Sequence, residues 1–407
     1  MKISGHLGSN VSWHFLVLAL LFAAMSTAQT KEKPGDVNAV WHFAVSGDSR
    51  NCGDVVMPAI AAGALRDHAA FYWHLGDLRA TFMVDDDIQQ AAKLKNKPLN
   101  ISDYQSQEWD DFIENEIAPF GEVPFYMGIG NHETIAPKGR EQFAIQFADW
   151  LDASILREQR LLDNRKWRAQ GRLSDSEKNR NARQLKTYFH WKQGVVDFIY
   201  LDNATPDQFD AEQLKWFDRV IKDDAEDNSI RTVVVGVHAS LPWSISCDHS
   251  MNESGEGERS GQRVYLQLLD LQNKSHKHVY VLASHSHFFM DGIYNTKYWR
   301  EHGGVLPGWI VGTGGAQRYR LPANKSDAKS AVEDTYGYLL GTVHPDGTIQ
   351  FDFKEVKESD VPVSVKERYT PEFVHTGCFE GNRRMDPPKA PDFCAAVAEP
   401  VGQAASQ

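Results

Sequence analysis

The chain has 407 residues, of which 42% are hydrophobic, so it can bury one large core or two modest ones. Its formal net charge of -12 and its pI near 5.7 argue against a protein that binds nucleic acid irrespective of sequence, because such proteins are usually basic.

The first residues are typical of an export signal. Lys2 opens a polar stretch, residues 13–24 form an apolar segment too short to span a bilayer comfortably, and residues 26–28 offer small side chains at the expected cleavage spacing. We therefore predict a signal peptide over residues 1–28 and a secreted or periplasmic protein, with an uncleaved membrane anchor as the alternative. No other long apolar run follows, and we expect no membrane contact after cleavage.

Five apolar, β-rich segments each run into a polar or glycine turn, which predicts five buried strands. In chain order they are HFAVSGDS, AFYWHLGD, FYMGIGNH, TVVVGVH and VYVLASHSH. Loops that follow buried strands can hold metal-binding groups in fixed positions. The metal-binding side chains at these strand ends are Asp48, Asp77, Asn131, His238, His285 and His287.

Helical sequences between these strands predict a parallel core sheet. VMPAIAAGALRDHA follows the first strand, and AEQLKWFDRVIKDDA and RVYLQLLDLQ precede the last two. TYFHWKQGVVDFIYLDN predicts two antiparallel strands around a Gln-Gly turn, and a further hairpin is expected at Pro345, Asp346 and Gly347. Composition and pattern alone therefore predict an α/β protein.

Together the strand-end side chains are typical of a two-metal hydrolase. Two divalent ions about 3.5–4 Å apart need carboxylate, amide-oxygen and imidazole ligands, including a bridging carboxylate, and open positions for water and a phosphate oxygen. Taken alone, an aspartate after glycine is about as often a turn residue or a helix cap, and a single His-x-His pair is a weak signal. The combination of all five segments favours the metal site.

The order Asp, Gly-Asp, Gly-Asn-His-Glu, His and His-x-His resembles the calcineurin-like metallophosphoesterase superfamily, which includes the purple acid phosphatases. The resemblance covers residues 40–356 and implies two facing mixed β-sheets flanked by helices, a four-layer αββα sandwich. We therefore expect a metallophosphoesterase domain over residues 29–360, with insertions near 81–119 and 155–186. A partly disordered C-terminal extension is expected over residues 361–407.

The resemblance implies two divalent ions, of manganese, iron or zinc, with Asp77 as the carboxylate that bridges them. The other candidates match the ligands of one ion each: Asp48 and His287 of the first ion, and Asn131, His238 and His285 of the second.

Two further residues match the family's catalytic machinery. His132 matches a histidine that hydrogen-bonds the phosphate or protonates the leaving oxygen, and Glu133 is expected to fix the tautomer of that imidazole. The mechanism implied by the resemblance is in-line attack of a metal-activated hydroxide on phosphorus, without a covalent intermediate.

One position departs from the family pattern. The family usually supplies Asp-x-His in the first segment, whereas this chain has Asp48-Ser49-Arg50, and arginine does not bind a metal ion. Purple acid phosphatases also lack that histidine, but they carry a tyrosine three residues after the bridging aspartate, where this chain has Ala80. Three interpretations remain: Asn51 fills the gap, the first ion binds weakly, or Arg50 is a fixed cation that holds a phosphate oxygen. We favour the last, combined with a weakened first site.

Four cysteines in an exported chain allow three complete pairings. Cys52 follows Asp48 and Cys247 follows His238, so both should lie near the metal site, while Cys378 and Cys394 bracket a short tail. We therefore expect Cys52–Cys247 and Cys378–Cys394, with four free thiols as the alternative.

The insertions are expected to form helices beside the active-site mouth and to set specificity. Residues 155–186 form either a solvated helical hairpin or a basic cap over an anionic substrate. Residues 247–261 are expected to be a surface loop. The candidate cations of the cap are Arg157, Arg160, Arg165, Lys166 and Arg168.

We expect a hydrolase of phosphate monoesters, because a monoester dianion carries more charge for Arg50 to neutralise than a diester does. The alternatives are a phosphodiesterase acting on a small-molecule or nucleotide diester, and a catalytically idle family member that only binds a ligand. The expected partner is a small phosphorylated substrate, which an acidic chain can bind because the metal charge dominates locally. No nucleic-acid scaffold is expected, and the oligomeric state does not follow from the sequence.

Overall fold

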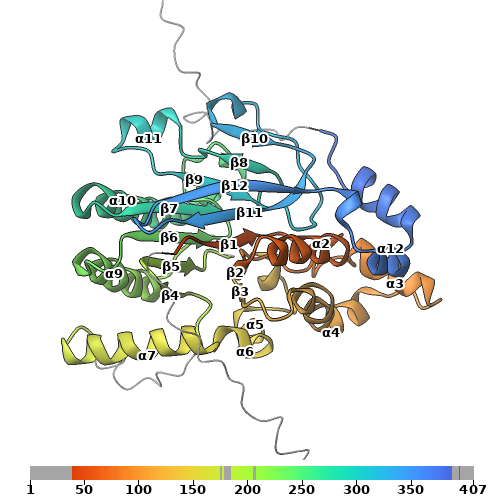
Figure 1. Ribbon diagram of the computed structural model, residues 1–407, viewed down its shortest axis with the longest axis horizontal. Coiled ribbons are helices and arrows are strands. Elements are labelled where there is room, and N and C mark those ends of the chain that lie inside the picture. The colour runs from red at the N-terminus through yellow and green to blue at the C-terminus, as the bar shows by residue number, and fades with distance from the viewer. Residues whose placement is uncertain (1–38, 175–176, 178–184, 205–207, 387–393, 395–407) are drawn as a thin grey trace, which may run out of the picture. The chain divides into compact units, whose positions relative to one another are not determined.

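The computed structural model describes residues 39–174, 177, 185–204, 208–386 and 394 (Figure 1). The predicted signal peptide lies outside these residues, as does most of the chain beyond residue 386. Within the described part of the chain, no helix is both long enough and apolar enough to cross a membrane.

The first of two β-sheets has five strands in the order β12-β11-β1-β2-β3. It is mixed, because β1, β2 and β3 run parallel while β11 is antiparallel to both β1 and β12. The predicted hairpin at residues 345–347 connects β11 to β12. The strands span Trp41–Ser46 (β1), Ala69–His74 (β2), Phe125–Met127 (β3), Tyr336–Val343 (β11) and Ile349–Val356 (β12).

The second sheet has seven strands in the order β10-β8-β9-β7-β6-β5-β4. Its central strands β5, β6, β7 and β9 are parallel, and β4 pairs antiparallel with β5 in the hairpin that the sequence predicts. The strands span Phe189–Gln193 (β4), Val196–Leu201 (β5), Thr232–Val237 (β6), His278–Ala283 (β7), Phe289–Asp291 (β8), Gly308–Val311 (β9) and Ser330–Val332 (β10).

Aromatic side chains fill the space between the two sheets. The ring of Phe198 on β5 lies 5.1 Å from the rings of both Phe43 on β1 and Phe71 on β2, edge to face in each case. Trp191 on β4 meets Trp73 on β2 in the same geometry, which is favourable for aromatic pairs. All five rings are buried, so the sheets face each other across one core and the predicted sandwich is confirmed.

Helices cover the outer faces of the sheets. α2 (Gly53–Arg66) packs on β2 and β11 of the first sheet, and α10 (Gly255–Ser275) packs on β7 of the second, beside α9 (Ala211–Glu226) (Figure 1). Each is the crossover helix that the sequence predicts before a parallel strand. Leu268 of α10 and Phe217 of α9 are fully buried, as the apolar faces of such helices should be.

Both predicted insertions contain helices among their described residues. The first contains α3 (Asp86–Leu94) and α4 (Ile101–Phe112), and the second begins with α7 (Ser154–Ala169). The other short helices are α5 (Arg140–Gln146), α6 (Ala148–Leu151), α11 (Lys297–Glu301) and α12 (Val363–Tyr369). Single 3-10 or π-helical turns occupy Ile113–Ile117, Ala118–Phe120, His132–Thr134, Cys247–His249, Met251–Glu253, Lys325–Asp327, Glu358–Asp360 and Phe373–Gly381.

The expected loop at residues 247–261 is partly wrong. Its first half forms the two turns just given, and α10 already begins at Gly255, where the Ser254 hydroxyl accepts the backbone N–H of Gly257 as an N-cap. The serine and glycine residues that suggested a loop therefore include the N-cap and the first residue of a helix.

The expected disulfide pairing is also wrong, because the bonds are Cys52–Cys378 and Cys247–Cys394. Cys52 is at the start of α2, behind the Asp48 loop, where the π-helical turn of the C-terminal extension packs. That turn is held in place by Arg318, which donates to the carbonyl oxygens of Cys378 and Phe379. The extension therefore returns to the segments that follow Asp48 and His238 and does not close on itself.

Candidate metal centre

The ligand candidates meet where the carboxyl ends of the parallel strands of both sheets come together. Asp48 and Asp77 follow β1 and β2 of the first sheet, and His238 and His285 follow β6 and β7 of the second. One potential ligand atom from each of these four residues lies within 4.8 Å of every other. Parallel strands place their carboxyl ends along one edge, and two facing sheets bring two such edges together.

Three of these residues have left-handed backbones. The φ angles are 59° at Asp48, 59° at Asp77 and 66° at His285, a conformation that is uncommon for residues other than glycine. Gly130 lets its own backbone lie close to the Asp77 carboxylate, since a Cβ at this position would lie only 2.3 Å from Oδ1 of Asp77. Strained residues of this kind persist at functional sites because the surrounding structure holds them.

The predicted ligands of the second ion converge on His238. Its Nε2 lies 3.0 Å from Oδ1 of Asn131, 3.2 Å from Oδ1 of Asp77 and 3.1 Å from Nδ1 of His285. Its other nitrogen faces the carbonyl oxygen of Leu75 at 3.0 Å, which fixes a proton on Nδ1 and directs the Nε2 lone pair at the other ligands.

This cluster needs positive charge. Burial would lower the pKa of His238, but the carboxylate of Asp77 outweighs it and raises that pKa to about 9, which means that this carboxylate favours a cation, either a proton or a metal ion, on Nε2. Among the residues that the structure describes, no lysine or arginine donates to His238, Asn131 or His285. Two imidazoles, a carboxylate and an amide oxygen that face one another fit a divalent ion such as manganese, iron or zinc.

The predicted first site is different, because the guanidinium of Arg50 lies inside it. Nη2 of Arg50 is 2.9 Å from Nε2 of His287, Nη1 contacts Nε2 of His132, and Nε is 3.7 Å from Oδ2 of Asp77. Asp48 completes the set, with Oδ1 at 3.2 Å from Nε2 of His287. The structure thus brings together all six predicted ligands and two of the three predicted catalytic residues, His132 and Arg50, while the third, Glu133, lies behind them on the backbone of the Asp77 and Gly130 loops.

Both histidines at Arg50 are held as neutral acceptors. Nδ1 of His287 lies 2.7 Å from the carbonyl oxygen of Gln317, and Nδ1 of His132 lies 2.7 Å from that of Ala80. Each Nδ1 therefore carries the proton, and each Nε2 accepts from Arg50. Burial and the nearby guanidinium lower the pKa of His287 to about 4. Burial also lowers the pKa of His132.

One expectation about a neighbouring side chain is wrong, and one of the three interpretations of the first site is contradicted. Glu133 does not fix the tautomer of His132, because its carboxylate accepts the backbone N–H groups of Asp77, Leu78 and Gly130. Burial and then the charge of Asp77 raise the pKa of Glu133 to about 8, whereas the backbone N–H groups of Gly130 and Leu78 favour its ionised form. Asn51 does not fill the gap in the first site, since its Oδ1 accepts the backbone N–H of Gln317. The Glu133 carboxylate therefore fixes the Asp77 and Gly130 loops, and the backbone carbonyl of Ala80 orients the His132 imidazole.

A pocket beside the centre contains residues that the sequence analysis did not single out. The ring of Tyr319 lies 4.0 Å from that of His287, the ring of His249 lies 5.4 Å from that of His285, and the guanidinium of Arg384 lies 3.8 Å from the Tyr319 ring centroid. All three line the pocket. The histidine within a polar segment after His238 was the one available signal, whereas no motif marks Tyr319 or Arg384.

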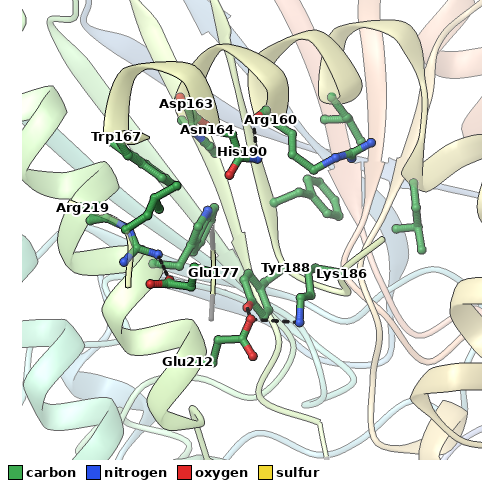
Figure 2. A pocket seen from close by; sticks show the side chains of 15 residues that line it. Arg160, Asp163, Asn164, Trp167, Glu177, Lys186, Tyr188, His190, Glu212 and Arg219 are labelled. Atoms are coloured by element: carbon green, nitrogen blue, oxygen red, sulfur yellow. Dashed lines mark hydrogen bonds and ion pairs between the residues drawn. The ribbon is translucent and has the colours of Figure 1, made fainter. Parts of the chain in front are cut away.

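Three of the five cations of the predicted basic cap engage acidic side chains nearby. Arg157 and Arg160 of α7 pair with Asp152, and Lys166 pairs with Asp223. Figure 2 shows a second pocket here, between α7, β4 and α9, with Arg219 paired to Glu177 and Lys186 to Glu212. None of its lining residues is a predicted ligand. These contacts favour a structural helix over a substrate cap.

Comparison with known proteins agrees with this geometry. The family model of the calcineurin-like phosphoesterases matches residues 50–289, which is more than half of the chain. No curated protein matches. The structure is similar to that of purple acid phosphatase PPD1 from yellow lupin (Lupinus luteus) seeds, with 16% identity and a TM-score of 0.51 over 79% of this chain and 52% of that one. This chain thus spans about half of the length of the lupin structure.

Two further solved structures match at lower TM-scores. GAP50 of Plasmodium, described as the anchor in the inner membrane complex, is 12% identical with a TM-score of 0.44, over 78% of this chain and 84% of that one. PhoD is 15% identical with a TM-score of 0.42, over 85% and 78%. The sandwich of two mixed sheets, the buried Asp and His cluster at its edge and the family-model match agree, and the chain belongs to the calcineurin-like phosphoesterase family.

Proposed function

We propose that this protein is a metal-dependent phosphoesterase that hydrolyses a small phosphate monoester. One observation carries the proposal: Asp77, Asn131, His238 and His285 direct acceptor atoms at one another in a buried cluster that needs a cation. A divalent ion bound there would supply Lewis-acid charge for a phosphoryl oxygen and lower the pKa of water.

The chain's own residues would bind and orient the substrate. Arg50 is charged, because the carboxylates of Asp77 and Asp48 raise its pKa although burial acts in the opposite direction. It presents a fixed cation to a non-bridging phosphate oxygen, which favours the dianion of a monoester. Neutral His132 orients that guanidinium through Nε2 and borders the reacting centre, and Glu133 holds the Asp77 and Gly130 loops by their backbone N–H groups.

The proposed location is outside the cytoplasm. Two disulfides join the described cysteines, and such bonds persist in oxidising compartments. Together with the predicted signal over residues 1–28, they support a secreted or periplasmic enzyme.

The first test is hydrolysis of an aryl phosphate monoester by the purified chain, before chelation, after chelation and after manganese is restored. We expect activity that is lost with the chelator and returns with the metal. His238→Ala should reduce kcat by more than about 100-fold, because even outer partners of a metal ligand cost about 10–100-fold. His276→Asn is the matched control, since His276 is exposed at the end of α10 with a left-handed backbone that asparagine tolerates. A folded protein that hydrolyses only diesters, or nothing, would contradict the proposal.

A further inference from the structure

The two halves of the metal centre obtain positive charge in different ways. In the half around His238, the acceptor atoms of Asn131 and Asp77 face an imidazole lone pair, and no described cationic side chain donates to that imidazole. In the half around His287, the guanidinium of Arg50 already donates to the imidazole. The family's two-ion arrangement therefore fits the second ligand set and not the first.

The position of Arg50 leaves no room for the first ion. An ion shared by His287 and Asp77 would have to lie about 2.0–2.2 Å from Nε2 of His287 and from a carboxylate oxygen of Asp77. Nη2 of Arg50 is 2.9 Å from that Nε2, and its Nε is 3.7 Å from Oδ2 of Asp77, so the guanidinium lies across the space between them. Like-charge repulsion in a buried site would add to the steric conflict.

Arg50 is also built into its position. Its side chain is only 11% exposed and contacts two histidines whose tautomers are set by the backbone carbonyls of Gln317 and Ala80. Both lone pairs that would serve a metal ion in this half are thus used by N–H donors of one side chain. A surface arginine that had swung in by chance would lack this matched pair of acceptors.

We infer that the guanidinium of Arg50 permanently takes the place of the first metal ion, and that the centre holds a single divalent ion. That ion would be bound by Asp77, Asn131, His238 and His285. The inference rests on the proposed function for the presence of any ion and adds the number of ions and the nature of the second cation. It also predicts that phosphate is held on one side by directional N–H donors rather than by a second Lewis acid.

Metal counting tests this directly. The full-length purified chain is stripped with a chelator, dialysed against manganese and measured for bound metal and for its electron paramagnetic resonance spectrum. We expect one manganese per chain, with the spectrum of an isolated ion. Arg50→His restores the family's ligand and should bind a second manganese, visible as spin coupling between two ions. Arg50→Gln, which removes the charge and shortens the side chain, should admit a second, weaker ion through Asp48 and His287.

The matched control is Arg320→His, which places a new histidine in the neighbouring pocket but outside both ligand sets. It should still bind one manganese. Two tightly bound ions in the wild type would overturn the inference and leave the proposed function intact. A count that stays at one in both folded Arg50 variants would also overturn it. No bound manganese in the wild type would overturn the inference and the proposed function together.

A second inference comes from a different feature, the loop after Asp77. Phe82 is 55% exposed although its ring lies only 5.3 Å from the ring of His132. The preceding residue, Thr81, has a φ of 59°, which is a rare outlier for a β-branched residue. α4 holds this strained turn: Tyr104 accepts the N–H of Thr81 at 3.4 Å, and Gln105 donates to its carbonyl oxygen at 2.9 Å.

An exposed aromatic ring on a turn that a packed helix holds in place is suited to contact a ligand. His132 borders the reacting centre on the proposed function, so a group stacked on Phe82 would be the alcohol portion of the substrate. We propose that Phe82 is a specificity residue that favours monoesters of aromatic or broad apolar alcohols. The first insertion thus acts on specificity through one ring and the helix that holds it.

The test compares kcat/KM for an aryl phosphate with kcat/KM for a small alkyl phosphate. Phe82→Ala should lower the aryl value by about 3-fold to 12-fold, the scale of an aromatic contact, and change the alkyl value less than about 2-fold. Phe82→Tyr keeps the ring and should restore the preference. Equal losses on both substrates would overturn this inference alone. Failure of the wild type on both substrates would overturn it together with the proposed function.

Discussion

At the scale of single residues, the carboxylate of Glu133 shows how the ligand loops are fixed. It accepts three backbone N–H groups, two of them through Oε2. Glu133→Gln turns one of its oxygens into a donor that must face a backbone N–H. We expect a loss of about 1–3 kcal/mol in the free energy of unfolding, measured by urea denaturation. A variant with unchanged stability would show that water replaces the lost acceptor.

His190 gives a residue-scale prediction with a defined pH sign. It is buried between Asp163 at 2.7 Å and Asp197 at 2.8 Å, and these carboxylates raise its pKa well above the ordinary value although burial opposes them. Because the folded pKa is raised, the stabilisation is complete below the unfolded pKa of about 6.5 and is lost as the pH rises through the folded pKa. Urea denaturation of wild type and His190→Gln should therefore differ more at about pH 6 than at about pH 9 or above.

At the same scale, the positions of the candidate ligands could be predicted from the sequence, and the tautomers of the histidines could not. Asp48, Asp77 and His238 each follow an apolar β-rich run, and a strand end of this kind can be recognised without a structure. The expectation for Glu133 failed because adjacency in sequence to His132 says nothing about which groups the two side chains face. Its partners at Asp77 and Leu78 are more than fifty residues away along the chain.

At the scale of elements, Arg79 connects the loop after β2 to the helices α2 and α4 through ion pairs. Its fully buried guanidinium contacts Asp54 of α2 at 2.6 Å, Asp111 of α4 at 2.6 Å and Glu116 at 2.9 Å. Arg79→Met leaves several carboxylates buried without a cation. We expect a loss of about 3–5 kcal/mol in the free energy of unfolding. Arg66→Met, at an exposed end of α2, is the control and should change stability by less than about 0.5 kcal/mol.

The crossover helices could be predicted from their apolar periodicity, whereas the effect of the first insertion could not. α3 and α4 were expected near the active-site mouth because of where the insertion begins. The strained backbone of Thr81 and the exposure of Phe82 depend on contacts with Tyr104 and Gln105, which no local pattern encodes. Helix propensity predicts that residues such as those of α4 form a helix, but only tertiary contacts determine which loop that helix fixes in place.

At the scale of the whole molecule, the disulfide Cys52–Cys378 ties the C-terminal extension to the start of α2 across 326 residues of sequence. A bond that closes so long a loop removes much conformational freedom from the unfolded chain. Replacing both cysteines by serine should lower the free energy of unfolding by about 2–5 kcal/mol, measured by denaturation under non-reducing conditions. The other disulfide closes a shorter loop of 147 residues, so replacing Cys247 and Cys394 by serine provides the comparison. Equal stability of the wild type and the Cys52 and Cys378 double variant would contradict the expectation.

The two sheets could be predicted from the sequence only through the family resemblance, since composition and periodicity indicated no more than α/β. The disulfide pairing failed for a related reason. Cys52 and Cys247 do lie in segments near the metal centre, but each belongs to a different sheet's edge and meets a different part of the returning extension. Pairing depends on the path of the last residues, which carry little periodic signal.

The candidate ligands come from both sheets, so the site is complete only when the two sheets are packed against each other. Asp77 belongs to one sheet and His238 to the other, so a chain with separated sheets has no complete binding site even when every strand is formed. On the proposed function, metal affinity would therefore measure assembly of the aromatic core around Phe198, which lies far along the chain from the candidate ligands. By the same linkage, each tenfold rise in free metal above the dissociation constant would strengthen that docking by about 1.4 kcal/mol.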